Sequence, residues 1–238
     1  MPQWKKTYAL SSVDAHGGRK REKITLNVHW RSIDSRPWYS HFHFQAELGW
    51  SYLHFKEVRA PNYREIAQNL ALSTGYAFLK GTLMAWVGLQ ATLFPYYKSQ
   101  SEVVRFLGVD GRIGYLIPKL ENTPWSVWIF AGWYYITMPT PNNFGFVDMS
   151  GPQVYPAVRY QITPKHSVST FFKYSPVSSS LNRSIFKNYE IAWGATYGYA
   201  WSKKWELLGG FKISRIDLNI DSVDVENTSY TLSAGIRF

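Results

Sequence analysis

Apolar and polar residues alternate with a period of two along most of this chain. Between Trp38 and Phe55, one set of alternate positions carries aromatic and aliphatic side chains, and the other carries polar and small ones. The stretch from Asn188 to Trp201 repeats this pattern. Strict alternation is typical of a β-strand whose two faces meet different surroundings. The pattern therefore predicts an all-β protein.

The same period predicts about twelve antiparallel strands. Most have ten or more residues, about twice the average strand length, and tilted membrane-spanning strands need about 9–11 residues. The expected strands are Trp4–Ser11, Lys23–Ile33, Trp38–Phe55, Arg64–Phe78, Thr82–Phe94, Val103–Ile117, Trp125–Met138, Gln153–Ile162, Ser167–Ser175, Asn188–Trp201, Trp205–Asp217 and Tyr230–Phe238. We expect residues 1–238 to form one domain, an up-and-down transmembrane β-barrel.

The predicted connections alternate between short and long. Short turns are expected at Asp34–Pro37, Lys80–Gly81, Pro118–Pro124, Thr163–His166 and Ser202–Lys204, and longer loops at Val13–Glu22, Lys56–Tyr63, Pro95–Glu102, Pro139–Pro152, Pro176–Lys187 and Leu218–Glu226. In an up-and-down barrel this alternation places all short turns at one end and all long loops at the other. Outer-membrane barrels have that asymmetry, with their short turns in the periplasm. An even number of strands then places both termini on the periplasmic side.

Aromatic residues gather where the predicted strands meet their connections. Trp125 and Trp205 lie near short turns, whereas Tyr52 and Tyr230 lie nearer long loops. Two such bands are typical of the girdles at the two membrane interfaces. The alternative is a soluble sandwich or a lipocalin-like barrel, whose outward face would be polar. The polar face from Ala192 to Ala200 is small rather than charged, which favours a confined lumen.

Composition narrows the class further. Aromatic residues and charged residues each make 18% of the chain, the formal net charge is +10, and there is no cysteine. The lack of cysteine excludes disulfide scaffolds, zinc–thiolate modules and cysteine nucleophiles, and the aromatic content excludes disorder. The uncharged stretch from Trp125 to Met138 is too short for a spanning helix. No signal peptide is visible at the start, and no motif supports nucleic-acid binding.

The end of the chain resembles Gram-negative outer-membrane β-barrel proteins. It reads Tyr230-Thr-Leu-Ser-Ala-Gly-Ile-Arg-Phe238, with a terminal Phe and apolar or aromatic residues at alternate positions before it. This resemblance implies that the barrel-insertion machinery is a partner during assembly and that the protein is integral to the outer membrane. It names no solute, and no specific family matches.

The inward residues decide whether anything passes through the barrel. Alternation places charges of both signs and several aromatic side chains inside. The candidate pore-lining residues are Glu47, Trp86, Asp110, Arg112, Trp128, Tyr134, Tyr155, Arg159, Lys173, Glu190 and Lys212. A small excess of bases favours a narrow channel for small or oligomeric solutes, biased toward anions or sugars. The alternative is a salt-bridged plug, in which Glu190 and Lys212 are one plausible pair.

Three further clusters carry weaker hypotheses. The histidines His29, His41 and His43 share an inner face, but no carboxylate is fixed beside them, so we predict neither a metal site nor a cofactor. Four acidic residues from Asp217 to Glu226 do not have the spacing of a calcium loop. Bases that suit lipopolysaccharide phosphates, as an alternative to a solvated loop surface, are Arg19, Lys20, Arg21, Lys56 and Arg59.

Two other functional classes stay open. A lipid- or lipopolysaccharide-modifying enzyme is a minority hypothesis, because the sequence has no Gly-x-Ser-x-Gly or His-Glu-x-x-His motif. A plugged barrel that anchors an envelope or secretion complex is the other, with the Pro-rich segment from Met138 to Phe146 as a candidate protein contact.

Overall fold

The computed structural model divides the chain into two compact units, Met1–Pro37 and Trp38–Phe238. Each unit is described by itself. The described residues are 5–13, 19–27, 41–57, 60–99, 104–117, 123–138, 149–176, 178–179, 188–202, 204–220 and 223–238.

The first unit contains a β-hairpin. Strand β1 (Lys5–Val13) pairs antiparallel with β2 (Arg19–Asn27) along their full length. Charged or polar residues fall on both alternate faces of each strand, so neither face suits lipid. Our assignment of these segments to the barrel wall was therefore wrong.

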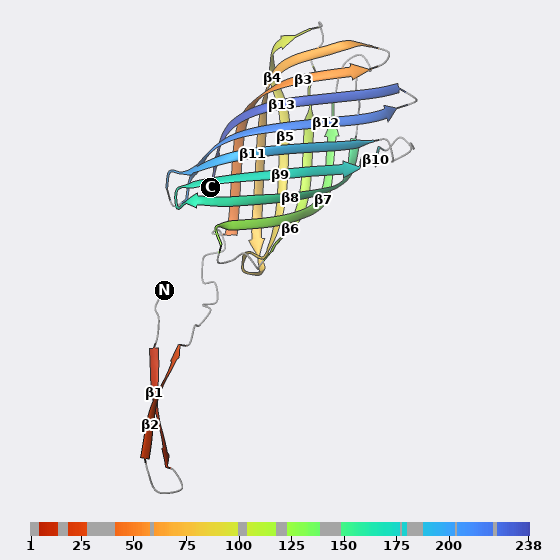
Figure 1. Ribbon diagram of the computed structural model, residues 1–238. Helices are drawn as coiled ribbons and strands as arrows, with labels where there is room; N and C mark the ends of the chain where they lie inside the picture. Colours follow the sequence, from red (N-terminus) through yellow and green to blue (C-terminus); the bar gives the residue numbers. More distant parts are fainter. Residues whose placement is uncertain are drawn as a thin grey trace. The chain divides into compact units, whose positions relative to one another are not determined.

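The second unit is a closed antiparallel β-barrel (Figure 1). Its wall strands are β3 (Phe42–Glu57), β4 (Ala60–Phe78), β5 (Leu83–Lys98), β6 (Leu107–Leu116), β7 (Trp125–Thr137), β8 (Met149–Thr163), β9 (His166–Pro176), β11 (Tyr189–Ala200), β12 (Glu206–Ile220) and β13 (Val223–Arg237). The two-residue strand β10 (Ser178–Ser179) pairs with one end of β8, and the 3₁₀ helix η2 (Leu79–Gly81) joins β4 to β5. In the described part of the chain, no helix has the length and apolar character needed to cross a membrane.

Ten described strands close this barrel, rather than the twelve expected. The first and last wall strands pair directly: the Phe44 N–H donates to the Phe238 carbonyl at 2.9 Å, and the Phe238 N–H donates back to the Phe44 carbonyl at 2.8 Å. On the other side of the ring, β8 pairs with β9. A closed ladder offers no free edge to which β1 and β2 could add.

The connections differ in length between the two ends of the barrel. We call the end of the barrel that contains Phe238 the turn end. Its shortest connection is the two-residue turn 164–165 between β8 and β9. The opposite, loop end contains the longer connections, but two of the expected loops are absent. Strands β3 and β4 remain paired as far as Glu57↔Ala60, so only residues 58–59 connect them. Strands β12 and β13 remain paired as far as Ile220↔Val223, so only residues 221–222 connect them.

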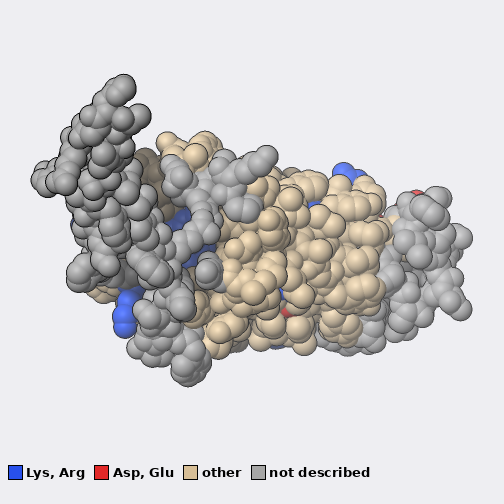
Figure 2. All heavy atoms as spheres, turned by 90° about the horizontal axis from the view of Figure 1, so that it is seen from below, with Lys and Arg blue, Asp and Glu red and all other residues tan. Residues whose placement is uncertain are grey.

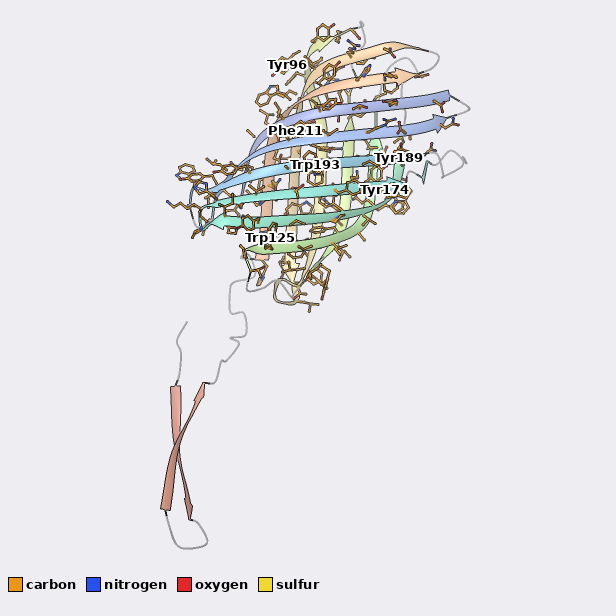
Figure 3. The ribbon with its side chains drawn as sticks, viewed as in Figure 1. Tyr96, Trp125, Tyr174, Tyr189, Trp193 and Phe211 are labelled. Atoms are coloured by element: carbon orange, nitrogen blue, oxygen red, sulfur yellow. The ribbon has the colours of Figure 1, made fainter. Side chains whose placement is uncertain are left out.

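The outer wall is apolar and aromatic. Trp193, for example, remains 46% exposed although it lies in the middle of β11. Trp125, Tyr174, Tyr189 and Trp193 project from the outside of the barrel in Figure 3, and the described surface in Figure 2 is almost entirely uncharged. A continuous apolar exterior around a closed ladder is the surface that lipid requires.

Candidate functional site

The strand register places the predicted pore-lining residues on the inner face of the barrel. Each lies at the alternate position opposite the exposed apolar residues, and the pairings carry this face around the ring. Trp86, for instance, stands opposite Gly75 on one side and Arg112 on the other. The other described candidates on this face are Glu47, Asp110, Trp128, Tyr134, Tyr155, Arg159, Lys173, Glu190 and Lys212.

An arc of aromatic rings lines the wall formed by β7, β8 and β9. Trp128 stacks on Phe130 with ring centroids 5.7 Å apart, and Phe130 meets Tyr155 edge-on at 6.0 Å. Tyr155 in turn stacks on Phe171 at 4.7 Å. Glycines opposite the rings make this packing possible, because a Cβ at Gly114 would overlap Phe130. This wall therefore fills much of the lumen on its side.

Arg112 packs against this aromatic arc and is neutralised there. Its guanidinium carbon lies 4.4 Å from the centroid of the Tyr155 ring, within cation–π range. Its Nε lies 2.6 Å from Asp110 Oδ2, and Gln153 Nε2 donates to the same oxygen at 3.4 Å. The positive charge of Arg112 is consequently compensated within the wall.

A second charged group lies toward the turn end around Glu206. Arg159 Nη2 lies 2.8 Å from one oxygen of Glu206, and Arg237 Nη1 lies 3.1 Å from the other. The Ser167 hydroxyl also donates to Glu206 at 2.7 Å. This carboxylate on β12 thus connects β8, β9 and β13 and leaves one positive charge in excess.

A further ion pair joins Lys173 to Glu190, with 2.7 Å between Nζ and Oε2. Lys212 was one plausible partner of Glu190 within the plugged-barrel alternative, and the register explains why Glu190 pairs with Lys173 instead. Lys173 stands opposite Ala192, which makes it a diagonal neighbour of Glu190. Lys212 stands opposite Gly194, four residues away along β11. Lys173 Nζ also lies 4.1 Å from the centroid of the Tyr134 ring.

The wall opposite the aromatic arc carries small polar side chains and borders a cavity of about 140 Å³. Ser51 and Thr231 hydroxyls meet at 2.5 Å, and Ser214 and Ser229 hydroxyls meet at 2.7 Å. The cavity is lined mainly by β3, β4, β12 and β13, with Glu47, Glu190 and Lys212 as its charged members. This cavity is therefore lined by hydroxyl, amide and charged groups together with apolar side chains such as Leu53, Phe106 and Ile136.

An apolar cluster occupies the lumen at the loop end. Its buried members are Phe55, Tyr63, Val104, Tyr134, Ile136, Met138, Met149, Ile216, Leu218 and Val225, with Phe106 packed against them. We did not anticipate this cluster. The available signal was apolar residues at inward positions near the ends of several strands, such as Met138, which is 0% exposed.

Hydrogen bonds hold a short segment before β6 against this cluster. The Val104 N–H donates to the buried carboxylate of Glu65 at 3.0 Å. The Phe106 N–H donates a hydrogen bond to the Thr92 hydroxyl oxygen at 3.2 Å, and the Thr92 N–H donates one to the Phe106 carbonyl. The segment 104–106 is thus fixed against the apolar cluster at the loop end.

The remaining predicted sites have different outcomes. Arg19, Lys20 and Arg21 lie in strand β2 rather than in a long loop, because the hairpin ladder extends to Val13↔Arg19. Lys56 lies near the end of β3, 3.9 Å from Glu226. Arg59 and His29 lie outside the described residues. Among the residues that the structure describes, no three His, Asp or Glu side chains are close enough together to hold a metal ion.

Comparison with known proteins finds similarity to solved structures alone. No protein-family model matches it, and neither does any curated protein. Solved structures that resemble it are Gram-negative outer-membrane β-barrels. Neisserial surface protein A shows 15% identity over 83% of this chain and 96% of its own, with a TM-score of 0.42.

Two other solved structures have similar identity, coverage and TM-score. The translocator domain of the autotransporter NalP from Neisseria meningitidis has 8% identity, covers 87% of this chain and 91% of its own, and has a TM-score of 0.46. An outer-membrane channel from Pseudomonas putida F1 has 11% identity, covers 89% and 100%, and has a TM-score of 0.44. The functional argument for this chain depends on its own lumen.

Proposed function

We propose that the protein is a narrow outer-membrane channel for small polar solutes, with a slight bias toward anions. The observation that carries this proposal is the cavity inside the barrel, which the wall side chains leave unfilled and which both polar and apolar side chains line. A lumen that served only to fill the barrel would be packed across its section, as in eight-stranded barrels. The exposed apolar exterior supports residence in the membrane.

The anion bias follows from the charges between the apolar cluster and the turn end. In this section the described strands turn five basic side chains inward, Arg112, Arg159, Lys173, Lys212 and Arg237, and four acidic ones, Glu47, Asp110, Glu190 and Glu206. The buried carboxylate of Glu65 lies outside this section, against Val104 of the apolar cluster. One positive charge remains in excess. Because most of these bases are ion-paired, we expect a small bias rather than strict selectivity.

The size of the solute is limited by the barrel itself. Ten strands lie closer to the filled eight-stranded barrels than to porins of sixteen or more strands. The aromatic arc narrows the lumen from one side, and the apolar cluster narrows it at the loop end. We therefore expect passage of solutes about the size of a monosaccharide or smaller.

Conductance in a planar bilayer tests the proposal directly. Refolded protein should produce discrete current steps, and a salt gradient should give a reversal potential of the sign set by preferred anions. A correctly folded barrel that produces no steps under any salt condition would contradict the channel. Folding is checked independently by circular dichroism of the same sample.

The apolar cluster favours a second candidate, a closed barrel that anchors an envelope complex. In that case lipopolysaccharide and a protein partner, rather than a solute, would be the ligands. Co-purification from outer membranes after cross-linking would detect such a partner. The two candidates differ in the bilayer experiment, because a closed anchor carries no current.

A further inference from the structure

Two charged side chains face the cavity without an ion pair to any described residue. Of the five basic side chains in this section of the lumen, Lys212 alone lacks such a partner. Of the four acidic side chains there, Glu47 alone lacks one. Both line the same cavity. An isolated charge in a confined space is costly unless water or a ligand compensates it.

The neighbours of Lys212 explain why it is unpaired. Its ladder partners are Gly194 on β11 and Thr231 on β13, and neither carries a carboxylate. Along its own strand the inward positions on either side are Gly210 and Ser214. Its neighbours in the ladder are thus small or hydroxyl-bearing, and the carboxylates of Glu190, Asp110 and Glu47 act on the ammonium group electrostatically without forming an ion pair with it.

Glu47 retains acceptor capacity in the same way. Its carboxylate accepts hydrogen bonds from the Ser233 hydroxyl, at 2.7 Å, and from the Gln45 amide, both neutral donors. An ionised carboxylate has about four lone-pair sites. At least one site therefore stays available for a charged donor from the cavity.

The backbones of the two residues are offset along the barrel, and both side chains line the same cavity. Lys212 stands level with Thr231, and Thr231 with Ser51. Ser51 and Glu47 are four residues apart on β3, which is about 13 Å along the strand. The cavity of about 140 Å³ holds roughly ten water molecules by the usual measure, enough for a solute with a similar number of non-hydrogen atoms.

We propose that this cavity binds a small zwitterionic solute of amino-acid size, with its carboxylate at Lys212 and its ammonium group at Glu47. The hydroxyl and amide groups of Ser51, Asn69 and Ser229, which line the same cavity, supply further hydrogen bonds. This inference rests on the proposed function, because it takes the cavity as part of the solute path. It adds to the slight preference for anions a site that recognises both charges of one molecule.

Binding of three size-matched probes tests the inference. We would titrate refolded protein in detergent with L-alanine, propionate and ethylammonium by calorimetry. L-alanine should bind at least about tenfold more tightly than either singly charged probe, since a hydrogen bond to a charged group contributes about 1.5–3 kcal/mol. Equal affinities for all three, or no binding of L-alanine, would overturn the proposal.

Single substitutions should convert the site to one that recognises a single charge. Lys212→Gln should weaken L-alanine at least about tenfold and leave ethylammonium binding unchanged. Glu47→Gln should likewise weaken L-alanine binding at least about tenfold and leave propionate binding unchanged. The matched control is Lys165→Gln, which removes the same charge from an exposed turn. If Lys212→Gln and Lys165→Gln bind L-alanine equally well, Lys212 is not part of a site.

A charge exchange guards against variants that fail through misfolding. Lys212→Glu combined with Glu47→Lys should recover much of the L-alanine affinity that each single charge reversal loses. Failure of the well-folded double variant to recover any affinity would contradict direct recognition by these two groups.

The binding and current measurements separate this proposal from the channel itself. Current without selective L-alanine binding leaves the channel standing and refutes the zwitterion site. Charge-dependent binding without current supports the site and refutes the channel.

Discussion

Lys173 and Glu190 form an ion pair across the β9–β11 ladder, with 2.7 Å between Nζ and Oε2. The pair removes one base and one acid from the free charge of the lumen. Lys212, on the other side of β11, forms no ion pair with any described residue, although the carboxylates of Glu190, Asp110 and Glu47 act on it electrostatically. The electrical character of the lumen therefore depends on which bases are paired, and not only on how many are present.

Breaking this ion pair should change selectivity and stability together. Glu190→Gln leaves the Lys173 ammonium without a carboxylate, so we expect greater anion preference and a loss of about 1–3 kcal/mol in the free energy of unfolding. Reversal potentials and urea titrations in vesicles measure the two effects. The double variant Glu190→Gln with Lys173→Met should regain most of the stability. An unchanged reversal potential for Glu190→Gln alone would show that this pair does not face the conducting path.

Neutralising two paired arginines should shift the lumen toward cations. Arg112→Gln with Arg159→Gln changes the lumen charge from one positive in excess to one negative in excess. The reversal potential in a salt gradient should change sign, while the barrel still folds. As a control, Lys165→Gln with Lys204→Gln removes two charges from exposed turn positions and should leave the potential near the wild-type value. Identical potentials for the two double variants would argue against a lumen role for the arginines.

The lipid-facing position of Trp193 can be tested by introducing a charge. Trp193→Arg should reduce stability in vesicles by about 2–4 kcal/mol if the residue lies at the bilayer midplane. Urea unfolding followed by fluorescence measures the change. Trp193→Leu, which stays apolar, should cost much less. Equal costs for Arg and Leu would mean that this face does not contact lipid.

Truncating the apolar cluster should widen the constriction at the loop end. Met138 has no exposed surface in the cluster, so Met138→Ala should lower the free energy of unfolding by about 2–5 kcal/mol and raise single-channel conductance. Leu232→Ala is the matched apolar truncation outside the lumen, because Leu232 is 63% exposed on the outer wall. It should leave conductance unchanged. If Met138→Ala conducts no better than Leu232→Ala, the cluster does not limit the current.

Much of this architecture could be predicted from alternation alone. A period of two assigns each residue to a face without any knowledge of neighbours, and it therefore placed Trp193 and Arg112 on opposite sides of the wall. The antiparallel barrel class followed from long, uniform strands. These properties are local, since they depend only on a residue's position in its own strand.

The strand count, the ion-pair partners and the constriction were decided by the tertiary structure. Closure by β3 pairing with β13 excludes the hairpin strands β1 and β2, and no local pattern reports which strands will be ring neighbours. Glu190 meets Lys173 rather than Lys212 because ladder register and side-chain reach determine pairing. The apolar cluster draws its members from strands far apart in sequence, so it exists only once the ring has closed. Alternation within a strand assigns faces, whereas contacts between strands depend on closure and register, which a single strand's sequence does not contain.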